Sequence, residues 1–439
     1  MKFLLLKIIN IIAVIVLMYL LANRYMSWGI NEYSILMFAS ISGFAMVMLI
    51  NSLIGTGNKV IITPNTVYYL FVFLFGYSFI PLSNTNEQIK IDAFIVLFFS
   101  VFFFLTGIYI GKGIKFRFSP LPIQTNIRIL IFRLTFIFSI IVFLLECARV
   151  GFIPLFNMFS VDVYGQMNEN AIPILHYFVQ MANILPILAY ILHKKNLISS
   201  NERNIVLAGC AFIMLNSLSR QTWVLTIICF GVYYMFYYVL SKKKFLIVLF
   251  LTLILFLGIG AIRLLTITYD DRSNVEYLKD YSDIDYDANL VEVYLGLYST
   301  NNFTTLKRFV KTADDANYLG LGVYTFKPVF TLLGLSKFDS FDINKDLDSF
   351  SALGTYAIEP YLDFGLIGVI FINLFYGIFV SYTYKRYREG KERWIVPWGV
   401  MAFCLVMAAF TNFFNTFFVW FVLTLNFLIL APSNNYGKN

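Results

Sequence analysis

Residues 92–110 read DAFIVLFFSVFFFLTGIYI, with one charged side chain, Asp92, at the start. A helix needs about 20 apolar residues to cross a hydrocarbon core about 30 Å thick. Comparable apolar runs recur from Leu4 to Leu430. A barrel strand would be about ten residues long with alternating polarity. The runs therefore predict an all-α fold, a polytopic integral membrane helical bundle.

The composition indicates the same class. Of 439 residues, 59% are hydrophobic and 13% are charged, and the mean hydropathy is +0.75. These values exclude an ordinary soluble globular domain. The first apolar run follows Lys2 as in a signal peptide, but no small-residue cleavage site follows and further spans do, so it is interpreted as the first membrane helix. The four cysteines lie inside apolar runs without metal-ligand spacing.

The apolar runs predict about twelve spans in a single transmembrane domain, residues 1–439. The predicted spans are residues 4–21, 33–54, 67–82, 92–110, 129–148, 173–192, 204–219, 222–240, 245–266, 361–382, 394–411 and 413–431. An even number of spans places both termini on one side of the membrane. One long connection, residues 267–354, joins the ninth and tenth spans.

The distribution of Lys and Arg predicts the orientation. With the N-terminus inside, inside segments hold eighteen basic residues, whereas the short outside loops hold four, namely Arg24, Lys90, Arg149 and Arg220. Lys and Arg concentrate in cytoplasmic loops, so both termini are predicted to be cytoplasmic and the long connection to lie outside. The formal net charge of +8 is attributed to these loops and to anionic headgroups rather than to nucleic acid.

The long connection is rich in charge, because fourteen of the 25 acidic residues fall in it. Apolar residues recur at helical spacing in two stretches, the first with Leu290, Val293, Tyr294, Leu297 and Tyr298, and the second with Phe303, Leu306 and Phe309 or Val310. This spacing predicts amphipathic helices on the membrane surface or against the bundle. The alternative is a solvated loop without regular structure. No internal repeat is visible.

Four arginines at the predicted outer side are candidates for binding an anion: Arg149, Arg220, Arg263 and Arg272. Guanidinium groups bind phosphate oxygens in a forked geometry and stay charged at any relevant pH. A diphosphate would fit such a clamp. The alternative for each arginine is a side chain that extends along the apolar surface to reach the interface.

Glu359, Asp363 and His176 are candidates for a general base. The two carboxylates are four residues apart, so they share one face if the helix already includes Pro360. Either carboxylate could take a proton from a sugar hydroxyl or orient an arginine, or simply favour the positive end of the helix dipole. His176 is a candidate because histidine is the side chain suited to proton transfer near neutral pH, but a lone histidine near a helix end is also a common structural residue. His193 is interpreted as a surface residue.

No cofactor is expected. The sequence contains no zinc-type His or Cys pattern, no phosphate-binding Gly-rich loop before a Lys, and no dinucleotide fingerprint. ATP, NAD and a bound transition metal are therefore not predicted. The reaction would then be driven by an activated substrate.

Three short stretches and the topology resemble a known family. The stretches are Arg149 with Gly151-Phe152-Ile153-Pro154-Leu155-Phe156, the turn Ser217-Leu218-Ser219-Arg220-Gln221, and Glu359-Pro360-Tyr361-Leu362-Asp363-Phe364-Gly365. Together with about twelve spans and a long outside loop late in the chain, they resemble the oligosaccharide repeat unit polymerases, the Wzy or O-antigen polymerase family. The resemblance covers most of the chain in topology but only these stretches in sequence.

The resemblance implies a metal-independent membrane glycosyltransferase of the GT-C type in the bacterial inner membrane, active at the periplasmic face. Its donor and acceptor would both be undecaprenyl-diphosphate-linked oligosaccharides, and its product an O-antigen or capsule-type polysaccharide. A flippase that delivers the repeats and a chain-length regulator are the implied partners. Family arginines in two large outside loops match Arg149 and Arg272, and Arg220 and Arg263 join them by position.

The same scheme assigns a role to tyrosines. Tyr164, Tyr356 and Tyr361 are candidates for stacking on sugar rings, although tyrosine is common at membrane interfaces for physical reasons alone. Two rival functions remain. An O-antigen ligase would be expected to carry an essential histidine in the long late loop, which has none. A flippase or exporter would be expected to carry ionisable groups in mid-membrane, where this chain has few.

Overall fold

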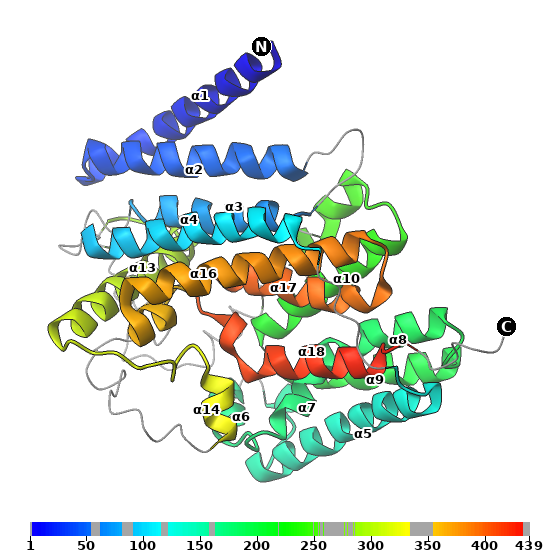
Figure 1. The fold of residues 1–439 in the computed structure, drawn as a ribbon. Helices are drawn as coiled ribbons and strands as arrows, with labels where there is room; N and C mark the ends of the chain where they lie inside the picture. The colour runs from blue at the N-terminus through cyan, green and yellow to red at the C-terminus, as the bar shows by residue number, and fades with distance from the viewer. Residues whose placement is uncertain are drawn as a thin grey trace. The chain divides into compact units, whose positions relative to one another are not determined.

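The computed structural model describes residues 2–53, 62–80, 91–115, 122–157, 163–217, 219–248, 250–252, 254, 258, 276, 279, 284, 286–333 and 354–432. The regular elements of these residues are helices (Figure 1). The predicted all-α class is therefore confirmed.

The longer helices follow the apolar runs of the sequence. Their bounds are α1 Lys2–Ala22, α2 Glu32–Leu53, α3 Pro64–Tyr77, α4 Ile91–Gly113, α5 Thr125–Val150, α8 Leu185–Lys194, α9 Ser200–Ser217, α10 Arg220–Tyr237, α13 Leu290–Asp315, α16 Ile358–Arg388, α17 Ile395–Met407 and α18 Phe417–Ile429. The shorter elements are α6 Val163–Glu169, α7 His176–Gln180, α14 Lys327–Leu332, and the 3-10 helices η1 Asn23–Trp28, η3 Pro154–Phe156, η4 Met181–Asn183, η6 Glu392–Trp394 and η7 Phe413–Asn415.

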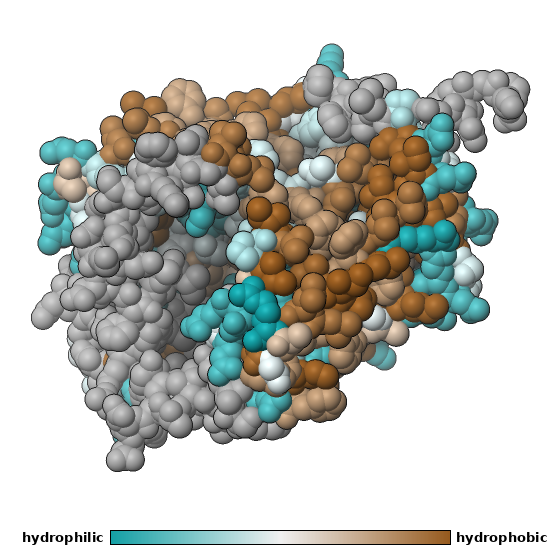
Figure 2. All heavy atoms as spheres, turned by 90° about the horizontal axis from the view of Figure 1, so that it is seen from below, coloured by the Kyte–Doolittle hydropathy of each residue, from teal (hydrophilic) through white to brown (hydrophobic). Residues whose placement is uncertain are grey.

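Several helices suit a membrane. In the described part of the chain, five are long and apolar enough to cross one, judged by length and composition: Ile11–Trp28, Glu32–Ser52, Ile91–Gly113, Thr125–Val150 and Ile358–Arg388. Large apolar side chains on these helices remain exposed, for example Phe98 and Phe102 on α4. Figure 2 shows hydrophobic residues over broad areas of one face of the molecule. Such surfaces are expected where lipid rather than water is the solvent.

Eleven of the twelve predicted spans overlap described helices, but only five of the described helices are long and apolar enough to cross a membrane. The remaining one, residues 245–266, lies mostly outside the described residues. Some spans are interrupted: residues 173–192 contain α7, η4 and α8 instead of one continuous helix. The number of membrane crossings therefore stays a prediction.

The chain divides into two compact units, each assembled from separated stretches of sequence. Unit 1 comprises Met1–Ile114, Tyr269–Tyr382 and Cys404–Thr416, and unit 2 comprises Lys115–Thr268, Thr383–Phe403 and Phe417–Asn439. The sequence predicted a single transmembrane domain without this subdivision.

Close helix packing holds unit 1 together. Gly107 on α4 lies against the backbone of α16 at Leu374, and Gly377 on α16 lies against the backbone of α4 at Phe104, so that a side chain at either glycine would collide with main-chain atoms. Gly111, one turn after Gly107, lies against Ser381. Small residues at this spacing allow two membrane helices to approach closely.

Residues 290–315 form one continuous helix, α13, where the sequence indicated two amphipathic stretches. Asn289 caps its N-terminus: the Asn289 side chain accepts from the backbone N–H of Glu292, whose side chain accepts from the backbone N–H of Asn289. The apolar face buries Val293, Phe303 and Leu306 and packs on α3 and α4 within unit 1.

Unit 2 contains two antiparallel helix pairs among its described helices, α5 with α18 and α8 with α9. Arg128 near the start of α5 donates from Nε to the carbonyl of Ile429 at the end of α18 over 2.9 Å, so α5 and α18 are antiparallel. α8 is almost completely enclosed, with Leu185 through Ala189 at 0% exposed apart from the proline between them. A short link of five residues, 195–199, joins α8 to α9, so α8 and α9 are antiparallel neighbours.

Candidate active site

The ends of α5 and α9 in unit 2 form the frame of the site. Arg133 on α5 makes a forked ion pair with Glu202 near the start of α9, with N–O distances of 2.8 and 2.9 Å. Beyond the other end of α5, the backbone N–H of Leu155 donates to Asn216 Oδ1 near the end of α9 over 2.9 Å. The two helices are therefore parallel. Their C-terminal ends, with η3 and the start of α10, are called the α5–α9 end.

A buried carboxylate and a histidine meet at the α5–α9 end. Glu146, in the last turns of α5, is 0% exposed. Its two oxygens lie 3.0 and 3.1 Å from Nδ1 of His176, the first residue of α7. Glu146 Oε1 also accepts from the backbone N–H of Ile172 over 3.0 Å. This environment satisfies the carboxylate from two directions.

The Glu146–His176 pair fixes the tautomer of the imidazole. A carboxylate accepts only, so the proton of a neutral His176 is assigned to Nδ1 and the lone pair to Nε2. The side chain is 27% exposed, which leaves the ring accessible to another molecule. A histidine held in this way by a carboxylate is suited to act as a general base through Nε2.

The turn before His176 is strained. Ile174 has a φ of 67°, a conformation that β-branched residues rarely adopt. The turn is closed by the backbone N–H of His176, which donates to the carbonyl of Ile172 over 2.9 Å. Strain of this kind is concentrated at functional sites, where the surrounding structure maintains it.

Arg149 follows Glu146 by three residues, in the last turn of α5. Its side chain is exposed, and the described residues include no ion-pair partner for it. Gly151 ends the helix with a φ of 86° and donates its N–H to Cys147. A cation is favourable at a helix C-terminus, so the fold stabilises the guanidinium charge at this position.

Arg220 is the first residue of α10 and follows Asn216 by four residues, so it belongs to the same end of unit 2. Its side chain is partly buried. The N-terminus of a helix carries a partial positive charge, and a guanidinium placed there adds to that charge instead of neutralising it. Both would stabilise an anion at this position.

The other predicted clamp residues cannot be placed in this frame. Arg263 and Arg272 lie outside the described residues. Tyr164 belongs to α6, but its side chain lies outside the described part. Of the four arginines, the structure therefore places Arg149 and Arg220, both at the α5–α9 end.

The two predicted carboxylates belong to unit 1, in the first turns of α16. The helix begins at Ile358 and includes Pro360 in its first turn, as the shared face of Glu359 and Asp363 requires. It then breaks at Phe364 and Gly365, whose φ and ψ values are non-helical.

Asp363 is 0% exposed and holds the turn that precedes α14. Its Oδ1 and Oδ2 accept from the backbone N–H groups of Tyr324 and Thr325 over 3.1 and 2.5 Å. The break in α16 also leaves the carbonyls of Leu362 and Asp363 without helical partners, and they accept from Gly320 and Leu321 instead. Asp363 thus has a clear structural role.

Glu359 is less completely bonded. Its Oε2 is buried and has no hydrogen-bond partner among the described residues. The Asn412 amide donates to the Tyr376 hydroxyl over 3.3 Å. Of the two carboxyl groups, Glu359 is therefore the one with an oxygen that can still accept a hydrogen bond.

Two predicted sugar-stacking tyrosines are in unit 1. Tyr356 is 0% exposed; its hydroxyl lies 2.6 Å from that of Tyr68, and its ring packs edge-on against Phe71 and Phe104. Burial in the aromatic core disfavours a role in sugar stacking. Tyr361 is half-buried and its hydroxyl donates to Asp314 over 2.6 Å.

Glu146 was missed as a site residue by reasoning from sequence. It is 30 residues from His176, so no local spacing connects them. One signal was present: a carboxylate inside an apolar span is costly and requires a partner. His176, the only histidine on the predicted outer side, was the natural partner to consider.

No protein-family model, curated protein or solved structure matches this sequence. The assignment of function therefore depends on the geometry of the described residues.

Proposed function

We propose that this chain is a membrane glycosyltransferase that joins polyprenyl-diphosphate-linked oligosaccharide repeats into a polysaccharide. The observation that supports it best is the Glu146–His176 pair at the α5–α9 end, where Arg149 and Arg220 also lie. A base and cationic groups at one end of the same helices are what transfer from a diphosphate to a hydroxyl group requires.

In the proposed reaction, His176 Nε2 takes the proton of the acceptor sugar hydroxyl while that oxygen attacks the anomeric carbon of the donor. The bond between this carbon and the diphosphate oxygen breaks, and its electron pair leaves with the polyprenyl diphosphate. Arg149 and Arg220 stabilise the negative charge that develops on the leaving group. Glu146 stabilises the imidazolium that forms. Attack opposite the leaving group inverts the anomeric centre.

The growing chain is the donor, and the newly arrived repeat unit is the acceptor, as in the polymerases that the sequence resembles. The enzyme would lie in the bacterial inner membrane with about twelve spans, both termini in the cytoplasm and the α5–α9 end at the periplasmic face. The charge distribution supports this orientation, because the loops that carry Arg149 and Arg220 are poor in Lys and Arg.

His176 is the preferred base among the three candidates. Asp363 already accepts two backbone hydrogen bonds, which favours the structural role. Glu359 has a free oxygen, but it belongs to unit 1, whereas both described arginines of the clamp belong to unit 2. His176 shares a unit and a helix end with them.

Deletion of the gene tests the reaction class. Cells without the protein should attach a single repeat unit to the final acceptor and lack the ladder of longer chains. Loss of all surface glycan, including the single repeat, would indicate a ligase or a flippase and would contradict the proposal.

Variants in the deletion strain test the residues. We expect His176→Ala, Arg149→Ala and Arg220→Ala each to reduce the polymerisation rate about 10²-fold or more at unchanged protein level. Arg149→Lys should also lower it, because an ammonium group cannot make the forked contact. Arg203→Ala is the matched control, since Arg203 lies at the opposite end of α9. Full activity in the first three variants would exclude this site.

A further inference from the structure

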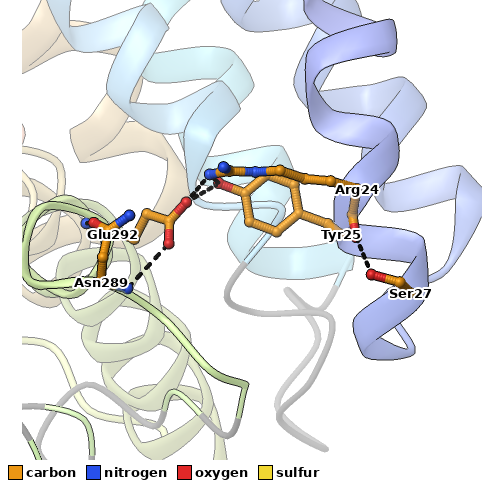
Figure 3. Close-up of polar contacts among 5 residues, drawn as sticks. All are labelled: Arg24, Tyr25, Ser27, Asn289 and Glu292. Atoms are coloured by element: carbon orange, nitrogen blue, oxygen red, sulfur yellow. Dashed lines mark hydrogen bonds and ion pairs between the residues drawn. The ribbon is translucent and has the colours of Figure 1, made fainter.

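A pocket of about 510 Å³ lies in unit 1, where η1 and the start of α13 approach the end of α3. Figure 3 shows its polar side, with Arg24 and Tyr25 reaching from η1 toward Glu292 on α13. Tyr25, Tyr77 and Glu292 form a buried floor, each 6% exposed. The more exposed rim consists of Arg24, Asn289, Val291 and Leu295. Sites for small molecules have volumes of about 300–1,000 Å³, so the pocket is large enough for a small ligand.

The charges of the pocket neutralise each other. Arg24 forms an ion pair with Glu292 Oε1, and the Tyr25 hydroxyl donates to the same oxygen over 3.1 Å. Glu292 Oε2 accepts from the backbone N–H of Asn289 over 3.1 Å. The cation and the anion of the lining are thus paired with each other. A charged ligand would have to compete with this pair, so the pocket favours a neutral one.

One tyrosine hydroxyl of the floor, that of Tyr77, is buried and has no hydrogen-bond partner of standard geometry within the described residues. Tyr286 does not line the pocket; its ring packs edge-on against Tyr25, with centroids 5.9 Å apart. A buried polar group without a partner costs about 1–3 kcal/mol. A ligand that supplies a hydroxyl group to the Tyr77 hydroxyl removes that cost.

Two aromatic residues, Tyr25 and Tyr77, line the pocket, and further rings pack behind Tyr25. Trp28 stacks on Tyr286 at 4.9 Å, and the Arg24 guanidinium lies 5.0 Å from the Tyr25 ring centroid. Tyr and Trp combine an apolar ring with one polar group, which matches a molecule that has apolar faces and a hydroxylated edge. Neutral sugars have this character.

We propose that this pocket between η1 and α13 binds a neutral sugar residue of a glycan, as a binding site additional to the reacting groups of unit 2. The choice of a sugar among neutral polyhydroxylated ligands rests on the proposed function. By the charge distribution, η1 and α13 belong to the predicted outer side, where the glycan would be. The site would hold a glycan without taking part in the chemical step.

Binding to the purified full chain in detergent tests this proposal. The probe is the free oligosaccharide released by mild acid from the cell's own lipid-linked repeats, which carries neither the lipid nor the diphosphate. Saturation-transfer NMR detects contact with sugar protons, and titration gives the dissociation constant. We expect saturable binding by the wild-type protein.

Variants locate the site. Tyr77→Phe removes the floor hydroxyl but keeps the ring, so we expect binding about fivefold to tenfold weaker. Tyr33→Phe is the matched control, because Tyr33 is 67% exposed and does not line the pocket; its affinity should be unchanged. Arg24→Gln, at the exposed rim, should also weaken binding and is a second variant in case Tyr77→Phe impairs folding.

His176→Ala distinguishes the two proposals, because it should abolish polymerisation but leave binding of the free oligosaccharide intact. Absence of binding by the wild-type protein, or equal affinity in Tyr77→Phe, Arg24→Gln and wild type, would overturn the sugar site while the polymerisation assays stand. A further outcome would also overturn the proposal. If phosphatidylglycerol micelles displace the oligosaccharide equally from wild type and from the control Tyr33→Phe, the pocket binds a lipid headgroup.

Discussion

Glu146 combines a structural requirement with a chemical use. A carboxylate inside an apolar helix is expensive unless its oxygens are bonded, and His176 with the N–H of Ile172 provides the bonds. The same contact orients the imidazole and assigns its proton to Nδ1. An interaction needed for stability thus also prepares Nε2 to accept a proton.

Replacing Glu146 by Gln tests this dual role. Gln keeps the size and can still accept from Ile172, but its amide can donate to Nδ1 of His176 and so favours the tautomer that is protonated at Nε2. We expect polymerisation in membrane vesicles to slow about 10²–10⁴-fold at unchanged protein level. Glu202→Gln removes a surface carboxylate of the same unit and should change the rate less than about twofold. An equal loss in both variants would contradict the orienting role.

Glu392 leads to a prediction about pH. Partial burial acts to raise the pKa of its carboxyl group, but hydrogen bonds from Lys195 and Tyr237, over 2.6 and 2.5 Å, outweigh burial and hold the pKa below its ordinary value. A carboxyl group whose pKa is lower in the folded state stabilises the fold above its unfolded pKa of about 4.3 and loses this effect as the pH falls through the folded pKa.

We therefore expect Glu392→Gln to unfold at a lower temperature than wild type at pH 7, with a gap that closes as the pH falls below about 4. Thermal unfolding in detergent at several pH values measures the gap. Glu169→Gln is the control, because that side chain is exposed and should give no gap at any pH. A gap in Glu392→Gln that is constant with pH would refute the assignment.

At the scale of elements, the break in α16 determines what the first turns of the helix can do. Phe364 and Gly365 leave helical geometry, Gly365 with a φ of 61° and a ψ of −150°. The carbonyls freed by the break, together with the Asp363 side chain, bind residues 320–325. The break thus fixes a segment of the long connection to a membrane helix.

Gly365→Ala tests the break. Its φ and ψ belong to a region that is accessible almost only to glycine, and an added Cβ would meet no atom within 4 Å. The effect is therefore backbone strain alone, which we expect to destabilise the protein by about 1–3 kcal/mol. Gly231→Ala is matched, because it also meets open space but lies inside the regular helix α10, where alanine is favourable. Equal unfolding temperatures for the two variants would refute the strain.

For the whole molecule, the sequence predicted what depends on composition and periodicity. The all-helical fold and the helix positions follow from apolar runs of membrane length, and the helix start near Glu359 follows from Pro360 in the first turn. The resemblance drew attention to Arg149 and Arg220, which the structure places at one end of unit 2.

Contacts between distant residues could not be predicted in this way. Arg24 and Glu292 are 268 residues apart, and Tyr68 and Tyr356 are 288 apart. Neither pair has a periodic signal, because each contact exists only after the helices have packed. The buried state of Tyr356 and the structural bonds of Asp363 have the same origin, so a sequence reading had no basis for separating Asp363 from Glu359.

Cysteine labelling tests the orientation of the whole chain. The four native cysteines are buried, which gives a low background for a membrane-impermeant maleimide. We expect Phe156→Cys, at a position 79% exposed beside the α5–α9 end, to react in intact spheroplasts. Lys243→Cys, in a predicted inside loop, should react only after the membrane is opened. The reverse pattern would invert the predicted topology.

The parallel course of α5 and α9 has a consequence for the depth of His176, the proposed base. Between them the chain must return across the bilayer, and His176–Lys194 is the segment that does so in the proposed topology. If its elements lay along one axis, the α-helical residues would extend about 22 Å and the 3-10 turn about 6 Å more, at most about the thickness of the hydrocarbon layer. The length of this segment would then set the depth of His176. With Lys194 at the inner membrane surface, the imidazole would lie at the level of the outer membrane surface.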